Sequence, residues 1–350
     1  MGTRAALLCL AVATADAASA HEPTLSRFNY RDDVRPLFLS HCAGCHHASG
    51  VAPMSLLEYQ EAVPWANAIQ LALLEGRMPP FLPSDDSGPF RDARALTAVE
   101  IDTLVDWAVG ATPEGEPLEE AEEVRSPAPP AADLLLRGAV DVVLGEDESE
   151  KTACVVLPTG LHTPRLVTGL EVFPGRASVL RRATILVGDS CSDGEPLATW
   201  LPDRTRVSFP DGLGRELPAS STLALELLYV KGWGAEGKRL TDRSALGLWF
   251  SERAAPVRSV RIEDRRIQLK QATRLVALCP TSGDESPLRV EAVAPDGTTR
   301  LLLAIDRFDA AWREKYFFRE PLVLPAGSAL RASHAGVWVD LASTASRSNE

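Results

Sequence analysis

The sequence lacks both the long apolar run of a membrane span and the basic cluster of a nucleic-acid-binding surface. A transmembrane helix needs about 20 consecutive apolar residues, and Asp16 interrupts the apolar residues of the opening segment, MGTRAALLCLAVATADAASAHEP. Lysine and arginine nowhere form a run, and the formal net charge is −12. Because phosphate binding requires clustered positive charge, this composition argues against nucleic acid as a partner.

Residues 1–20 instead have the pattern of an export signal peptide. Arg4 precedes the apolar run, and Ala-Ser-Ala ends at position 20, as is typical of cleavage before His21. A retained anchor is the alternative. With cleavage, Cys9 leaves with the signal, no transmembrane segment is expected, and the mature protein is periplasmic or extracellular. Its length of about 330 residues suggests two or three domains.

Cysteine is scarce, with six residues in the chain, yet two stand in the stretch SHCAGCHHASG at 40–50. The string C-x-x-C-H is typical of a c-type haem attachment site. Cys42 and Cys45 can each form a thioether to a haem vinyl group, and His46 can present its imidazole to the iron. A zinc knuckle would need a second Cys/His pair and a redox dithiol a βαβ context, and the sequence offers neither. We therefore predict one covalent haem c with His46 as the proximal ligand.

Methionine is scarcer still, with three in the chain and two after the signal peptide. Methionine is a common sixth ligand of electron-transfer haem and raises its potential. Met54 follows His46 by only eight residues, so it reaches the opposite haem face with difficulty. Met78 precedes Pro79 and Pro80, which stiffen the loop that would hold its thioether. Met78 is the predicted distal ligand, and Met54 is interpreted as a core residue.

Helical patterns surround the motif and predict an all-α cytochrome c domain over residues 27–113. The segments are DDVRPLFLSHC, WANAIQLALLEG and TAVEIDTLVDWAVG. The third begins with a capping box, Thr97 to Glu100. Residues 114–132 are acidic and proline-rich, the composition of a linker.

Beyond the linker, short runs of Val, Leu and Ile alternate with Gly, Pro and Asp turns, which favours antiparallel β-sandwiches. We predict two tandem jelly-roll-like domains over residues 133–254 and 258–342, followed by a disordered tail at 343–350. The expected fold class is thus multidomain, with an all-α cytochrome c domain followed by all-β sandwich domains.

A resemblance to a known family can be stated on particular stretches. Residues 27–115 resemble a cytochrome c module in CAGCHHASGVAPMSL, GRMPPF and VDWAVGATPEG. Residues 133–340 resemble the β domains of copper type II ascorbate-dependent monooxygenases, the peptidylglycine and dopamine monooxygenase type. The matching stretches are CVVLP, VTGLEVFPGRASVLRRATILV, FPDGLGRELPASSTLALELLYV and PLRVEAVAPDGTTRLLLAIDRFDAAWREKYFFREPLVLPAGSAL.

The resemblance fails at the copper ligands. Where the family has a His-His pair, this chain has Arg181 and Arg182, and leucines 227 and 228 stand beside Tyr229 where it has another histidine. The family's His-x-His after a proline is replaced by Thr281, Ser282 and Gly283, and no methionine follows Met78. Arginine does not give up its proton to bind a metal. Copper is therefore not expected, and the β region is interpreted as a catalytically inactive, monooxygenase-like pseudoenzyme.

Other polar residues have plainer interpretations. Successive side chains of a strand point to opposite faces, so we expect one of Arg181 and Arg182 at the surface and the other paired with a carboxylate, anion binding being the alternative. The remaining histidines are interpreted as surface or hydrogen-bonding residues: His21, His41, His47, His162 and His334. An oxidising compartment permits a disulfide between Cys154 and Cys191, with Cys279 as a buried thiol.

The favoured function is one-electron transfer by an exported cytochrome, with the β region as a scaffold or docking module. An acidic surface can steer a basic redox partner in a salt-dependent way, and a small electron donor or acceptor is the other possible partner. A haem-coupled copper monooxygenase and a haem-based sensor or binding protein are the alternatives.

Overall fold

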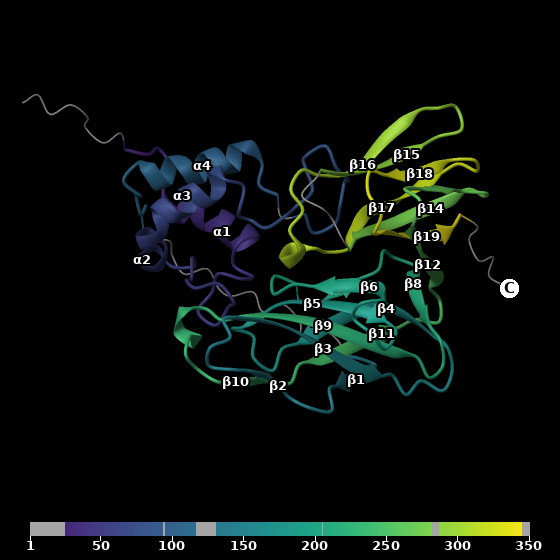
Figure 1. Ribbon diagram of the computed structural model, residues 1–350. Coiled ribbons are helices and arrows are strands. Elements are labelled where there is room, and N and C mark those ends of the chain that lie inside the picture. Colours follow the sequence, from purple (N-terminus) through teal and green to yellow (C-terminus); the bar gives the residue numbers. More distant parts are fainter. Residues whose placement is uncertain (1–24, 94, 117–130, 205, 282–286, 345–350) are drawn as a thin grey trace, which may run out of the picture.

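The computed structural model describes residues 25–93, 95–116, 131–204, 206–281 and 287–344. The signal peptide expected over 1–20 lies outside these residues, as do His21, most of the linker at 114–132, and residues 345–350 of the tail. Strands make up 39% of the chain and helices 15%. Figure 1 shows a short helical segment beside two β regions. No helix of the described residues is long and apolar enough to cross a membrane.

The N-terminal helical segment, residues 25–116, contains six short helices. They are η1 (Tyr30–Val34), α1 (Arg35–His41), α2 (Tyr59–Ala62), η2 (Val63–Trp65), α3 (Ala66–Leu74) and α4 (Ala98–Val109). The capping box at α4 is confirmed, since Thr97 accepts from the Glu100 amide and Glu100 accepts from that of Thr97. The aromatic rings of Tyr30, Phe38 and Trp107 pack together as the centre of a small core.

The expected fold class is wrong, because the structure is mostly β and its described residues contain no separate all-α domain. The longest helix, α4, has 12 residues, and long loops separate the helices. One of these loops leaves the helices and joins the second β region. Ser84 and Gly88 donate to the carbonyls of Ala304 and Leu302, and Phe90 forms a β-bridge with Phe318. The helical pattern does not indicate this pairing, because the pairing depends on residues more than 200 positions away.

The first β region is a sandwich that extends from β1 to β11. One layer has the order β3-β9-β5-β6, the other contains β1, β11, β4, β8 and β7, and β2 and β10 form a separate pair. The strands are β1 (Leu134–Arg137), β2 (Val142–Leu144), β3 (Glu150–Pro158), β4 (Arg165–Phe173), β5 (Leu180–Val187), β6 (Glu195–Trp200), β7 (Val207–Ser208), β8 (Leu213–Leu217), β9 (Thr222–Val230), β10 (Leu240–Asp242) and β11 (Ala245–Phe250). The short helix η3 (Trp233–Ala235) lies between β9 and β10.

The second β region extends from β12 to β19 and shares a sheet with the first. Parallel pairing of β8 with β12 joins β12, β19, β14 and β17 to the first region's layer, and β13, β18, β15 and β16 form the second layer. The strands are β12 (Ala255–Ile262), β13 (Arg266–Gln268), β14 (Thr273–Pro280), β15 (Leu288–Val293), β16 (Thr299–Ile305), β17 (Tyr316–Leu324), β18 (Ala329–Ala332) and β19 (Val337–Ser343). Helix η4 (Ala310–Trp312) precedes β17.

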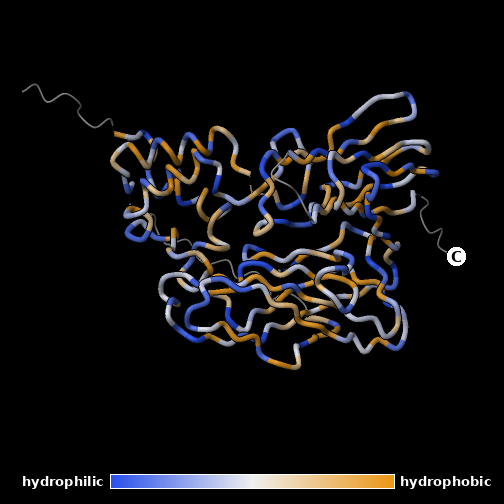
Figure 2. The backbone as a smooth tube through the Cα atoms, in the orientation of Figure 1, coloured by the Kyte–Doolittle hydropathy of each residue, from blue (hydrophilic) through white to orange (hydrophobic). Residues whose placement is uncertain are grey.

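Apolar side chains form one core cluster in each of the three regions, and Figure 2 shows hydrophobic stretches in all three. The cluster of the first β region also contains Val276, Ala277 and Phe317 of the second. Phe90 of the helical segment belongs to the cluster of the second β region. The cores therefore extend across the borders between regions, which fixes the regions against one another.

The disulfide between Cys154 and Cys191 is present in the structure. It joins β3 to the loop between β5 and β6, with a Cα–Cα distance of 6.0 Å. The cross-link closes a 37-residue separation, and restricting a loop of this size in the unfolded chain contributes about 2–4 kcal/mol of stability. Cys279 is a free thiol, and burial raises its pKa to about 11.

A buried ion pair lies where the two β regions meet. Lys315 Nζ is 2.7 Å from Asp340 Oδ2, and the two side chains are 2% and 1% exposed. The same ammonium donates to the carbonyls of Pro196 and Leu197 in β6 of the first region. Ser259 Oγ donates to the other carboxylate oxygen of Asp340. Removing either charge would leave the other one buried without its partner.

We expect Lys315→Met to lower the free energy of unfolding by about 3–5 kcal/mol, the usual cost of breaking a buried pair. The matched control is Lys238→Met, because Lys238 is exposed, and it should have little effect. Urea unfolding of the wild type and of the two variants measures these free energies of unfolding. Equal stability of the two variants would contradict this role for the pair.

Candidate functional site

The C-x-x-C-H motif forms a tight turn directly after α1. Cys42 is the C-terminal cap of the helix, and its amide donates to the carbonyl of Phe38. The amides of Cys45 and His46 both donate to the carbonyl of Cys42, at 3.1 and 2.9 Å. Among the described residues neither cysteine forms a disulfide, and both are half-buried. Helix α1 and this turn therefore place the two sulfur atoms and the imidazole in one short stretch of chain.

A cavity of about 820 Å³ opens at this turn. Its lining includes the three motif residues and both candidate methionines: Cys42, Cys45, His46, Met54 and Met78. Apolar side chains from α1, α3 and α4 form another part of the wall: Phe38, Ile69, Leu73 and Leu104. The volume lies in the upper part of the range of about 300–1,000 Å³ that is usual for ligand pockets. The structure therefore brings together every residue that the sequence assigned to haem binding.

The imidazole of His46 is held in one orientation. Its Nδ1 atom is 3.3 Å from the carbonyl oxygen of Met54. A proton on Nδ1 that is donated to this carbonyl leaves Nε2 as the atom with a free lone pair. Burial lowers the pKa of His46, and the bond to Met54 opposes this shift. The neutral imidazole that an iron ion requires is therefore the favoured form near neutral pH.

Cys42 lies in a buried environment. Burial, and secondarily the nearby Cys45, raises the pKa of the Cys42 thiol to about 12. A thiol with such a pKa stays protonated at neutral pH and is a poor thiolate ligand or redox nucleophile. This observation disfavours the alternative of a redox dithiol, which needs a reactive thiolate.

Met78 and Met54 differ in how the fold places them. Met78 follows Gly76, whose φ of +64° ends α3, and its side chain is 37% exposed. Met54 packs against the core of the helical segment and supplies the carbonyl that contacts His46. Met54 already contributes to the His46 side of the cavity through its backbone. This arrangement supports Met78 as the candidate for the opposite side.

The two β regions complete the cavity. Leu201, Pro202 and Asp203 come from the loop after β6, and Arg307, Asp309 and Trp312 come from the segment between β16 and β17. A Cβ atom at Gly44, inside the motif, would collide with Cα and Cβ of Asp203. Trp65 and Trp233 pack their rings 5.5 Å apart across the same border. The motif therefore rests directly on the first β region, a contact that the sequence does not predict.

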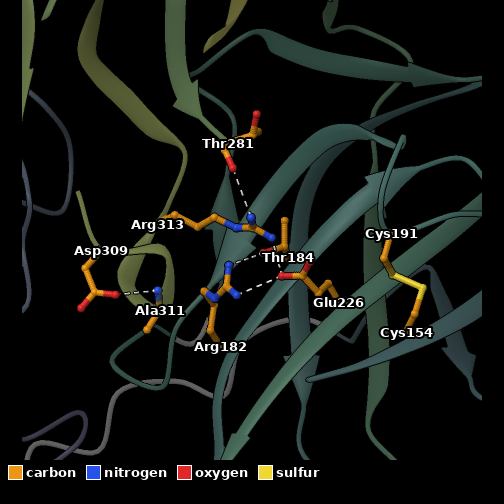
Figure 3. Close-up of polar contacts among 9 residues, drawn as sticks. All are labelled: Cys154, Arg182, Thr184, Cys191, Glu226, Thr281, Asp309, Ala311 and Arg313. Atoms are coloured by element: carbon orange, nitrogen blue, oxygen red, sulfur yellow. Dashed lines mark hydrogen bonds and ion pairs between the residues drawn. A yellow bond between two sulfur atoms is a disulfide. The ribbon is translucent and has the colours of Figure 1, made fainter. Parts of the chain in front are cut away.

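Arg182 lies in an ion-pair cluster between the β regions. Its Nη2 atom is 2.9 Å from Glu226 Oε1, and Arg313 Nη2 is 2.5 Å from the same oxygen. Arg313 also donates to the carbonyl of Thr281, and Arg182 donates to Thr184, as Figure 3 shows. Burial and the neighbouring Arg313 lower the pKa of Arg182. Two members of the cluster, Arg182 and Thr281, stand at positions where the family resemblance places copper ligands.

Arg181 departs from the expectation that one arginine of the pair is exposed. It is half-buried and lines the cavity. Its guanidinium carbon lies 5.2 Å from the ring centre of Trp312. Arg182 is paired with a carboxylate, as expected, so neither arginine is a surface residue.

The remaining histidines lie apart from one another. His41 lines the cavity and is 3.5 Å from Glu100, His47 contacts Ser49, His162 is exposed, and His334 contacts the carbonyl of Pro287. Within the described residues no group of three or more His, Cys, Asp or Glu side chains is placed to hold a metal ion. A haem iron, held by a porphyrin and two axial ligands, does not need such a group.

Comparisons with known proteins do not identify a family. No family model and no curated protein matches the chain. Among solved structures, the major capsid protein P2 of bacteriophage PM2 is 10% identical, with 62% of this chain and 99% of that chain covered and a TM-score of 0.24. A putative secreted protein from Parabacteroides distasonis is 10% identical, with 58% of this chain and 89% of that chain covered and a TM-score of 0.17. A variant of oxalate decarboxylase from B. subtilis is also 10% identical, with 74% of this chain and 87% of that chain covered and a TM-score of 0.16. These scores carry no argument about function.

We expect Gly44→Ala to destabilise the protein by about 1–3 kcal/mol, the usual cost of forcing extra volume into a packed site. Gly234→Ala is the matched control, because nothing lies within 4 Å of a Cβ atom built there. Thermal unfolding of the two variants measures the difference. A Gly44→Ala variant as stable as Gly234→Ala would show that the motif does not rest on Asp203.

Proposed function

We propose that the chain is an exported c-type cytochrome that transfers single electrons. In this proposal Cys42 and Cys45 anchor one haem c covalently, and His46 and Met78 are its axial ligands. The group, when bound, supplies a reversible one-electron iron couple. The residues of the chain hold it, exclude water from its apolar side and fix the ligand orientation.

The observation that carries the proposal is the orientation of His46 in the wall of the cavity. A histidine that binds a metal usually donates its other ring N–H to a carbonyl or carboxylate, which fixes the tautomer. The contact between His46 Nδ1 and the Met54 carbonyl has this form. The two cysteines lie in the same wall, and an 820 Å³ cavity beside them gives room for a large planar group.

The β regions serve in this proposal as a scaffold that closes the cavity and offers a docking surface. Arg182 stands where the resemblance places a copper ligand and is held by Glu226, which Arg313 also contacts; this arrangement supports the absence of copper chemistry. The net charge of −12 favours a basic redox partner. The disulfide between Cys154 and Cys191 supports an oxidising compartment.

Covalent attachment is tested in a host that matures c-type cytochromes. We expect the exported wild-type protein to gain the mass of one haem, to keep its colour after denaturation, and to show a reversible one-electron couple. The Cys42→Ala/Cys45→Ala variant removes both thioethers and should lose the covalent colour. Cys279→Ala is the matched control for cysteine loss and should retain it. Colourless wild-type protein from such a host would contradict the proposal.

The distal ligand is tested by Met78→Ala. Loss of the thioether should abolish the spectrum of methionine-ligated haem and lower the reduction potential by a substantial part of the roughly 0.8 V over which axial ligands act. Met54→Ala is the matched control, because the Met54 contact to His46 comes from the backbone. Optical spectroscopy and a redox titration measure both variants. If Met54→Ala loses the methionine signature and Met78→Ala keeps it, the assignment of the distal ligand is wrong.

A further inference from the structure

Arg181 is placed at the cavity by an irregularity in strand β5. The pairing of β5 with β9 shifts between Leu180 and Arg182, so that Arg181 is the additional residue of a β-bulge. A bulge leaves its extra residue out of the ladder and redirects its side chain, and bulges are frequent beside functional sites. The strict alternation of side chains along a strand therefore does not hold at this pair of arginines. Arg182 enters the cluster with Glu226, and Arg181 lines the cavity.

Arg181 is half-buried, and its guanidinium lacks a full set of partners. Its Nε atom has no hydrogen-bond partner among the described residues. Burial lowers the pKa of Arg181, and the carboxylates of Glu150 and Asp309 act in the opposite direction. An arginine in this position is stabilised by an anionic ligand, because its planar fork matches a carboxylate.

The surroundings stabilise the Arg181 cation only in part. The ring of Trp312 lies 5.2 Å from its carbon and supports the cation from one side. Two of the acidic side chains that line the same cavity also have other partners. Asp309 accepts from the amide of Ala311, as Figure 3 shows, and Asp306 is 3.4 Å from Arg289.

We propose that Arg181 binds a carboxylate side chain of the haem, so that the first β region supplies the anionic anchor of the haem pocket. This inference rests on the proposed haem function. It assigns a binding role to Arg181, which belongs to the first β region and not to the helical segment that contains the C-x-x-C-H motif. The β regions then take part in cofactor binding and in setting its potential, beyond their role as a scaffold.

The test compares reduction potentials of the holoproteins of wild type, Arg181→Gln and Arg165→Gln. The control removes the same charge from the same β region, and Arg165 also lies over an aromatic ring, that of Phe250, at 4.7 Å. Without Arg181, an unbalanced carboxylate near the iron favours the more positive, oxidised state. We expect the ratio of reduced to oxidised protein at a fixed potential to fall about tenfold, which is about 59 mV for one electron. Arg165→Gln should keep the wild-type potential.

Two outcomes separate this inference from the function on which it rests. If the wild-type protein carries haem and the two variants have equal reduction potentials, the role of Arg181 is overturned. The cytochrome proposal then still stands. Wild-type protein without haem overturns both.

A second measurement needs no variant of Arg181, in case Arg181→Gln does not accumulate. Hydrogen exchange compares wild-type holoprotein with Cys42→Ala/Cys45→Ala protein, which has no haem attached. We expect the amides of residues 180–182 to exchange several-fold more slowly in the holoprotein, because haem binding fixes the bulge. Equal exchange at these amides overturns the inference.

Discussion

The parallel pairing of β8 with β12 is the constraint on which the arrangement of the molecule depends. It joins the two β regions into one continuous sheet and prevents them from turning freely against each other. The buried pair of Lys315 and Asp340 lies at the same junction and ties β6 to it. The cavity at the C-x-x-C-H turn has walls from both β regions. Its shape therefore depends on contacts far from the turn in sequence.

Local features of the fold are visible in the sequence, and long-range ones are not. The capping box at Thr97 and Glu100 is visible because it involves residues three positions apart. The loop around Phe90 lies within the residues 27–113 that the sequence predicts to be helical, yet it pairs with Phe318, and such a long-range pairing leaves no periodic signal. The short turns after residue 133 indicate strands, yet no pattern in them reveals that β8 pairs with β12 and so fuses the sheets.

The candidate site also combines local features that the sequence reveals with long-range features that it does not. The C-x-x-C-H spacing singles out Cys42, Cys45 and His46, and scarcity singles out the methionines. The sequence gives no indication that Arg181 faces the cavity, since alternation along a strand is the rule and the bulge is an exception to it. No motif in the sequence marks Asp203 or Trp312 as a residue of the cavity either. Only the three-dimensional arrangement brings them next to the motif.

The neighbouring, tilted rings of Trp65 and Trp233 give the molecule an internal optical probe. One indole belongs to the helical segment and the other to the first β region, and their centres are 5.5 Å apart. Two indoles at such a separation couple their electronic transitions and produce a paired band of opposite signs in circular dichroism. Separation of the two segments would abolish this band, even while each segment stayed folded. Dissociation of the segments can thus be followed spectroscopically without any added label.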